Sequence, residues 1–214
     1  MYTTALFDLD GTITDPGIGI TNSVAYALEK FNISVADRSE LFRFIGPPLH
    51  ESFQTFYGFS PEDSKRAVSY YREYYGRSGL YEAELYDGIR DTLLSLHTSG
   101  IKVVLATSKP ELYALQILQH FDLMSLFDRI CGSNMDGSRS KKAEVITYAL
   151  QSFPETSLND IVMIGDRLHD INGAKAVGID SIGVSYGYGS VDELHQAGAT
   201  HVISSPKELL SFFS

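Results

Sequence analysis

The 214-residue sequence has one cysteine and few basic residues, and each shortage excludes a class of protein. Cys131 has no partner for an internal disulfide, which excludes a disulfide-stapled fold and suits a reducing compartment. Lysine and arginine total 17 against 27 aspartates and glutamates, a formal net charge of -10. Such a chain would repel a polyanion, so we expect no nucleic-acid polymer as a partner.

Long hydrophobic runs are also missing. Runs such as residues 103–106 are far shorter than the roughly 18 to 20 consecutive apolar residues that a membrane-spanning helix needs. The N-terminus leads directly into an apolar strand pattern, without the basic and long apolar segments of a signal peptide. We therefore expect a cytoplasmic protein with no membrane partner. A monomer is the default expectation, because sequence alone does not locate an exposed apolar patch.

Short apolar runs alternate with helical patterns through most of the chain, and 43% of the residues are hydrophobic. The expected strands cover residues 5–7, 101–106, 129–131 and 161–164, with weaker candidates at 181–184 and 201–203. Strands that alternate with helices predict right-handed βαβ units, and hence a mainly parallel sheet covered on both faces. The predicted fold class is α/β, with a Rossmann-like core.

The pattern S-x-x-E, which is typical of helix N-termini, occurs twice near the C-terminus. It places Ser190 three residues before Glu193, and Ser205 three residues before Glu208. A serine side chain at the first of these positions can accept a hydrogen bond from the backbone N–H three residues later. The spacing therefore predicts two capped helices in this region.

One segment breaks the alternation of strands and helices. Residues 15–85 show helical spacing, as in residues 20–31, but no convincing strand. Residues 46–48, Gly-Pro-Pro, force a turn between helices because proline lacks an N–H donor and restricts the residue before it. The simplest interpretation is an all-helical cap domain, residues 15–85, inserted into a core domain formed by residues 1–14 and 86–214.

Four aspartates follow two of the predicted strands. Asp8 and Asp10 come directly after the first strand, and Asp166 and Asp170 follow strand 161–164. The carboxyl ends of parallel strands meet at one edge of a sheet, where such folds place their ligands. Clustered carboxylates repel one another unless a cation lies between them, and Mg²⁺ prefers a few hard oxygen ligands. Magnesium is therefore the implied cofactor.

Polar residues also follow the other two strands of this region. Thr107, with Ser108 beside it, ends strand 101–106, and Lys141 and Lys142 follow strand 129–131 by way of a loop. All four strand ends thus carry residues suited to phosphate chemistry.

These residues together resemble the motifs of the haloacid dehalogenase-like hydrolases, within them the phosphoglycolate phosphatase-like branch with a helical cap. The first motif, DxDGT, matches residues 8–12, and the second, a Thr or Ser after an apolar strand, matches Thr107. The third is a lysine, and the fourth, GDxxxD, matches residues 165–170. The resemblance covers essentially the whole chain. Lys142 is favoured over Lys141 because it directly precedes the residues where the family's helix begins.

The resemblance implies a role for each motif residue. Asp8 would be the nucleophile that receives the phosphoryl group. Asp10 would be the general acid and then the general base, and would lend its main-chain carbonyl to the metal. Thr107 and Lys142 would hold the phosphoryl oxygens. Asp8 and Asp166 would coordinate Mg²⁺ directly, and two roles stay open for Asp170, as a ligand through water or as the group that orients Lys142.

The implied activity is that of a magnesium-dependent phosphatase, a phosphoric monoester hydrolase acting on a small phosphorylated metabolite. An acid at position 10 favours phosphoryl transfer over carbon–halogen cleavage, because the family's dehalogenases have none there. Substrate contacts are expected from Ser108 and, in the cap, from Arg43 and Gly46, near His50 and Glu51. Residues 44–49 depart from the phosphoglycolate phosphatases, which leaves a nucleoside monophosphate, pyrophosphate or a sugar phosphate open as the substrate.

Two further interpretations compete with a phosphatase. A phosphomutase of the β-phosphoglucomutase kind uses the same core but returns the phosphoryl group to a sugar. A non-catalytic metabolite-binding module would keep the fold and is expected to have lost Asp8, Asp10 or Asp166, all of which are present.

Overall fold

The computed structural model describes residues 1–213 of the chain. These form two compact units, residues 1–15 with 85–213, and residues 16–84. Two short strands, β2 (Thr14–Asp15) and β3 (Glu84–Leu85), pair where the chain leaves the first unit and returns to it. The division into a core domain and a cap domain, as functional parts, stays a prediction. No helix among the described residues is long and apolar enough to cross a membrane.

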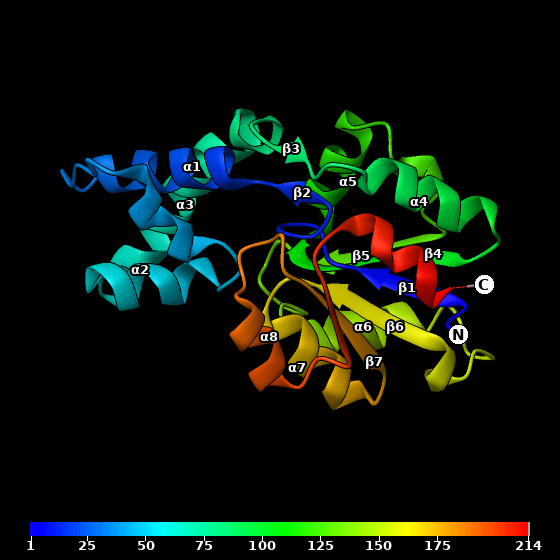
Figure 1. The fold of residues 1–214 in the computed structure, drawn as a ribbon. Helices are drawn as coiled ribbons and strands as arrows, with labels where there is room; N and C mark the ends of the chain where they lie inside the picture. The colour runs from blue at the N-terminus through cyan, green and yellow to red at the C-terminus, as the bar shows by residue number, and fades with distance from the viewer. Residues whose placement is uncertain (214) are drawn as a thin grey trace. The chain divides into compact units, whose positions relative to one another are not determined.

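The first unit is built on a six-stranded sheet in which all neighbouring strands run parallel (Figure 1). The strand order is β5-β4-β1-β6-β7-β8. Its strands are β1 (Thr4–Phe7), β4 (Lys102–Pro110), β5 (Arg129–Ser133), β6 (Ile161–Gly165), β7 (Asp180–Val184) and β8 (His201–Ile203). The prediction of an α/β fold with a mainly parallel sheet is confirmed.

Helices cover the two faces of this sheet (Figure 1). They are α4 (Ile89–Thr98), α5 (Glu111–His120), α6 (Lys142–Leu150), α7 (Leu168–Val177) and α8 (Val191–Ala197), with the 3₁₀ helix η5 (Pro206–Phe212). The central strands β1 and β6 are buried along their whole length, which explains why, apart from Thr4, their sequences carry no polar side chain. Cys131 lies in this core and is fully buried.

The strand order changes direction at β1, and this determines where a ligand can bind. The chain runs from β1 outward to β4 and β5, then returns across the sheet to β6 on the other side of β1. Crossover helices on opposite faces leave a crevice at the carboxyl end of the strand where the order reverses. Asp8, the residue after β1, therefore stands at the switch point of the sheet.

The second unit is helical, as predicted. It contains α1 (Gly17–Glu29), α2 (Leu49–Tyr57) and α3 (Pro61–Arg77), with the 3₁₀ helices η1 (Arg38–Phe44) and η2 (Gly79–Tyr81). Helix α1 and η2 approach so closely that a Cβ atom on Gly19 would lie 2.0 Å from the carbonyl oxygen of Gly79. The aromatic rings of Phe44, Phe53 and Phe59 pack together in its core.

The two S-x-x-E patterns behave differently. Ser190 caps α8 by accepting a hydrogen bond from the N–H of Glu193 at 3.0 Å. η5 begins directly after Ser205, with Pro206 at its first position, so the predicted boundary is confirmed, but the Ser205 side chain makes no capping hydrogen bond and that part of the prediction is wrong. The Ser205 hydroxyl instead donates to the Glu208 carboxylate at 2.9 Å. The same carboxylate accepts from the N–H of Ser204.

Candidate active site

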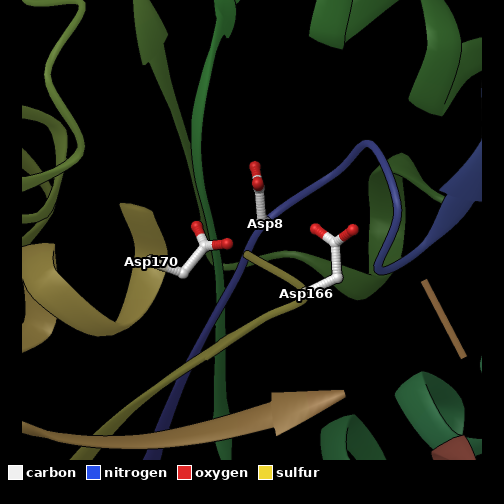
Figure 2. A group of neighbouring side chains, drawn as sticks. All are labelled: Asp8, Asp166 and Asp170. Carbon is white, nitrogen blue, oxygen red and sulfur yellow. The ribbon is translucent and has the colours of Figure 1, made fainter. Parts of the chain in front are cut away.

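Three carboxylates converge beyond the carboxyl ends of β1 and β6. Asp8 follows β1, Asp166 follows β6, and Asp170 lies in the first turn of α7 (Figure 2). One oxygen atom from each side chain lies within 4.8 Å of the others. The backbone N–H of Asp8 donates to Ile164 O of β6 at 2.9 Å, so the sheet itself fixes the distance between the first two residues. The structure thus brings together residues that the sequence separates by more than 150 positions.

Lys142 bridges two of these carboxylates. Its Nζ lies 2.8 Å from Asp8 Oδ1 and 2.8 Å from Asp170 Oδ1, and donates to the carbonyl oxygen of Ala106 at 3.0 Å. Its side chain is 3% exposed. The methylene stem packs on Gly173 of α7, where a Cβ atom would lie 2.7 Å from Lys142 Cγ. Lys141 is exposed, so Lys142 is the lysine that the structure places in the cluster.

Asp166 and Asp170 are both buried and are held by backbone donors. Asp170 Oδ2 accepts from the N–H of Arg167 at 3.1 Å, which fastens it to the start of α7. Asp166 Oδ2 accepts from the N–H of Tyr188 at 2.8 Å. Gly11 lies so close to this carboxylate that a Cβ atom there would be 2.1 Å from Oδ2. The backbone of Gly11 and the backbone N–H of Tyr188 therefore both lie close to the Asp166 carboxylate.

The electrostatics of the cluster favour a cation. Burial raises the pKa of Asp166 well above its ordinary value, and the neighbouring Asp170 raises it further. Burial raises the pKa of Asp170 to about 6, against the attraction of Lys142. Burial alone would lower the pKa of Lys142, but the Asp170 and Asp8 carboxylates outweigh it and raise that pKa. A buried ammonium group offsets only part of the negative charge.

Asp10 lies beside this cluster and pairs with a residue that sequence reasoning missed. Its Oδ2 is 2.7 Å from Lys109 Nζ, and the lysine side chain is 6% exposed. Together, the four aspartates and the two lysines leave two formal negative charges in the site. This is the charge that one divalent cation neutralises, so the donor set fits Mg²⁺.

Thr107 and Ser108 lie at the end of β4, and the two predicted cap residues lie in the other unit. Thr107 is buried, and its Oγ1 accepts from the N–H of Lys109 at 3.2 Å. Ser108 is half-buried. In the second unit, the Arg43 guanidinium lies over the ring of Phe56, 4.5 Å from its centroid. Gly46 has a φ of 103°, and a substrate-binding role for Ser108, Arg43 and Gly46 stays a prediction.

The model of the family described as haloacid dehalogenase-like hydrolase matches residues 5–184, which include all four motifs. The chain belongs to the haloacid dehalogenase-like hydrolases. The predicted family is confirmed.

Named relatives of this hydrolase are similar over nearly the whole chain. A 5′-nucleotidase from Pseudomonas aeruginosa is 44% identical over 94% of the chain and 90% of its own length. Tyrosine-protein kinase PtkA from Mycobacterium tuberculosis is 38% identical over 92% of the chain and 67% of its own length. A crystal structure described as a predicted phosphatase from Clostridium acetobutylicum has a TM-score of 0.94 and 47% identity, covering 99% of this chain and 98% of that one.

A relative from the expected branch also matches. A phosphoglycolate phosphatase from Colwellia psychrerythraea is 28% identical over 96% of the chain and 94% of its own length. With the family and the nucleotidase, it identifies the hydrolase as a phosphatase of the phosphoglycolate phosphatase-like branch, as the motifs indicated.

A glycine-rich loop of the hydrolase, residues 185–190, lies against the Asp166 side of the site. A Cβ atom on Gly187 would lie 2.3 Å from the carbonyl oxygen of Gly11, and one on Gly189 would lie 1.9 Å from that of Asp166. Between them, Tyr188 donates its N–H to Asp166 and its hydroxyl to Asp15. The signal in the sequence was the pair of glycines after a strand, which marks a close approach of backbone.

The space around Asp166 makes Gly11 of the hydrolase intolerant of a side chain. Gly11 has a φ of 79°, and Gly88 has a nearly equal φ of 76°, but a Cβ atom on Gly88 would have nothing within 4 Å. Gly11→Ala and Gly88→Ala therefore share a backbone cost of about 1–2 kcal/mol. We expect Gly11→Ala to lower the free energy of unfolding in urea by about 1–3 kcal/mol more than Gly88→Ala does, because the added Cβ overpacks against the Asp166 carboxylate. Equal losses in the two variants would contradict the close approach.

Proposed function

We propose that this phosphatase is magnesium-dependent and hydrolyses a small phosphate ester through an aspartyl phosphate on Asp8. The observation that carries the proposal is the Lys142 ammonium group at 2.8 Å from both Asp8 and Asp170, with Asp166 beside them. The positive charge of the lysine offsets the repulsion between a carboxylate nucleophile and a phosphate dianion. The Asp8 side chain is 14% exposed, so one side of it can still meet a substrate.

Asp8 and Asp166 would hold the metal, with the main-chain carbonyl of Asp10. In both side chains one oxygen is engaged by the protein, Asp8 Oδ1 by Lys142 and Asp166 Oδ2 by the N–H of Tyr188. Asp170 gives one oxygen to Lys142 and the other to the N–H of Arg167, which favours the role of orienting the lysine. Mg²⁺ bound there would neutralise part of the negative charge on the phosphoryl oxygens.

The chain's own groups account for both halves of the reaction. An oxygen of Asp8 bonds to phosphorus as the bond to the leaving oxygen breaks, and the Asp10 carboxyl group gives that oxygen a proton. The alcohol departs. Asp10 then takes a proton from water as the water oxygen attacks the aspartyl phosphate, which releases phosphate and restores Asp8. Thr107, Lys142 and backbone N–H groups hold the phosphoryl oxygens in both steps.

Nucleoside 5′-monophosphates are the substrate class that we propose first. The support is the relative named 5′-nucleotidase, which is 44% identical over 94% of this chain, against 28% for the phosphoglycolate phosphatase. The departure of residues 44–49 from the phosphoglycolate phosphatase pattern points in the same direction. We propose no kinase activity for this chain, because it spans only 67% of the length of PtkA.

The test is release of phosphate from a panel of compounds, measured with Mg²⁺ and with excess chelator. The panel contains nucleoside 5′-monophosphates, phosphoglycolate, pyrophosphate and hexose phosphates, and the products are identified by chromatography. We expect hydrolysis that needs Mg²⁺ and is fastest on a nucleoside monophosphate. Isomerised hexose phosphate without free phosphate would support a mutase, and full activity in chelator would contradict the metal dependence.

Magnesium should also stabilise the folded protein, because it neutralises buried carboxylates that repel one another. A ligand at about a hundredfold excess over its Kd stabilises a protein by about 2.7 kcal/mol, or roughly 5–10 °C in Tm for a chain of this size. We expect a Tm rise of this order between chelator and saturating Mg²⁺, measured by calorimetry. The same rise in Asp166→Asn would show that the ion binds elsewhere.

A further inference from the structure

The Asp10 carboxylate is held at one oxygen and covered at the other. Oδ2 pairs with Lys109 Nζ at 2.7 Å. Oδ1 is buried and has no hydrogen-bond partner among the described residues. The side chain as a whole is 19% exposed. A carboxylate with this arrangement depends on the lysine for its orientation, because its second oxygen has no donor in the described part of the chain to fix it.

Lys109 is brought to Asp10 by an irregularity at the end of β4. The register of β4 against β5 shifts between Ala106 and Pro110, and the strand ends at Pro110, directly before α5. Within this irregular end, the N–H of Lys109 donates to Thr107 Oγ1. The lysine is thereby removed from solvent, with 6% of its side chain exposed, whereas Lys102 at the start of the same strand is 54% exposed.

We propose that Lys109 is a positioning residue that orients Asp10 for proton transfer to the leaving oxygen. The inference rests on the proposed function. As the bond from phosphorus to the leaving oxygen breaks, the proton moves from the Asp10 carboxyl group to that oxygen, and negative charge develops on Asp10. The ion pair in the structure contains the ionised Asp10 that this transfer produces. Lys109 therefore stabilises a charge that grows in the transition state, which is how a fixed donor accelerates a step.

This role predicts an effect that depends on the leaving group. An alkoxide leaving group needs the proton, whereas p-nitrophenolate is stable enough to leave without it. The value of kcat/KM reports on the steps up to the departure of the leaving group, so it isolates this proton transfer from the later attack of water. We expect Lys109→Met to lower kcat/KM on a nucleoside monophosphate about 10²-fold, the typical effect of lost acid catalysis. On p-nitrophenyl phosphate the loss should be less than about tenfold.

The controls are a matched lysine and the acid itself. Lys102→Met removes a lysine of the same strand that pairs with Asp128 at 3.0 Å, and should leave both values of kcat/KM unchanged. Lys109→Arg keeps the positive charge and should restore part of the loss on the nucleotide. Asp10→Asn should show the same dependence on the leaving group, and Lys109→Met in the Asp10→Asn background should cost little more, because both changes remove one function.

Two results would overturn the inference. Equal losses on both substrates in Lys109→Met would mean that the lysine contacts the phosphoryl group or serves only the fold. Fully multiplicative losses in the double variant would mean that it acts independently of Asp10. If Lys109→Met does not fold, Lys109→Arg and Lys109→Gln provide the test. The loss of kcat/KM on the nucleotide is again compared with the loss on p-nitrophenyl phosphate. Failure of the proposed function itself would look different, because Asp8→Asn would then keep its activity on both substrates.

Discussion

Replacement of Asp8 by Asn is expected to lower kcat/KM on the order of 10⁴-fold or more. The amide has nearly the shape of the carboxylate but no anionic oxygen to attack phosphorus, and losses of this size follow removal of a catalytic nucleophile. The change also removes one of the two carboxylate charges beside Lys142 and leaves the charge of Asp170. Binding of substrate should change far less than turnover, because the missing interaction belongs to the transition state.

The measurement joins kinetics with direct detection of the intermediate. The wild-type enzyme is quenched in acid during turnover, and mass spectrometry of its peptides should locate a phosphoryl group on Asp8. The same peptide from Asp8→Asn should carry none. Asp87→Asn, at an exposed aspartate of the same unit, is the control and should turn over normally. A variant at position 8 that keeps more than about a tenth of the activity would rule out this nucleophile.

The fold could be predicted largely because its strands are short, apolar and buried on both faces. All four residues of β1 and all five of β6 are buried, and the apolar runs 5–7 and 161–164 within them were enough to predict both strands. The paired strands β2 and β3 were missed, since two-residue strands leave no periodic pattern. The position of the site followed from topology, because parallel strands bring their carboxyl ends to one edge.

The start of helix α6 determines which of Lys141 and Lys142 is buried. Lys141 is the N-cap of α6 and is exposed, while Lys142 is its first residue and is buried. Successive helical residues point about 100° apart, so only one of two neighbours can face the sheet. The spacing of the motif located the lysine of the site to within one residue. The start of the helix favoured Lys142 over Lys141.

Other parts of the site had no signature in the sequence. The pairing of Lys109 with Asp10 depends on a register shift at the end of β4, which is a property of the sheet and not of local residue types. The bond from Tyr188 to Asp166 uses a backbone N–H, which every residue except proline possesses. Likewise, Glu193 was predicted only as part of a helix cap. Its carboxylate in α8 also accepts a hydrogen bond from Arg167 Nε at the start of α7, at 2.9 Å.

Replacement of Lys142 by Met is expected to destabilise the protein by about 3 kcal/mol at neutral pH, as well as to remove most activity. The lysine side chain is 3% exposed, and its ammonium group compensates two carboxylates at once. Removing one partner of a buried ion pair leaves uncompensated charge in the interior, which typically costs about 3–5 kcal/mol. Methionine keeps much of the volume of the lysine stem that packs on Gly173, so the loss should be electrostatic.

The dependence of this loss on pH identifies its cause. Burial raises the pKa of Asp170 to about 6 even with Lys142 present, and removal of the ammonium group raises it further. Because the unfolded value is near 3.9, the folded state binds more protons between that pH and the raised pKa, and its stability falls as pH rises through the window. The deficit of Lys142→Met in urea unfolding, measured in chelator, should therefore be small at pH 5 and large at pH 8.

Two comparisons make this prediction decisive. Saturating Mg²⁺ should recover part of the loss at pH 8, because a cation bound by Asp8 and Asp166 replaces some of the missing positive charge. Lys141→Met removes the exposed neighbour and should change stability by less than about 0.5 kcal/mol at either pH. An equal deficit for Lys142→Met at pH 5 and pH 8 would show that the lysine serves the packing of its stem against α7, and not the charge balance on which the proposed chemistry depends.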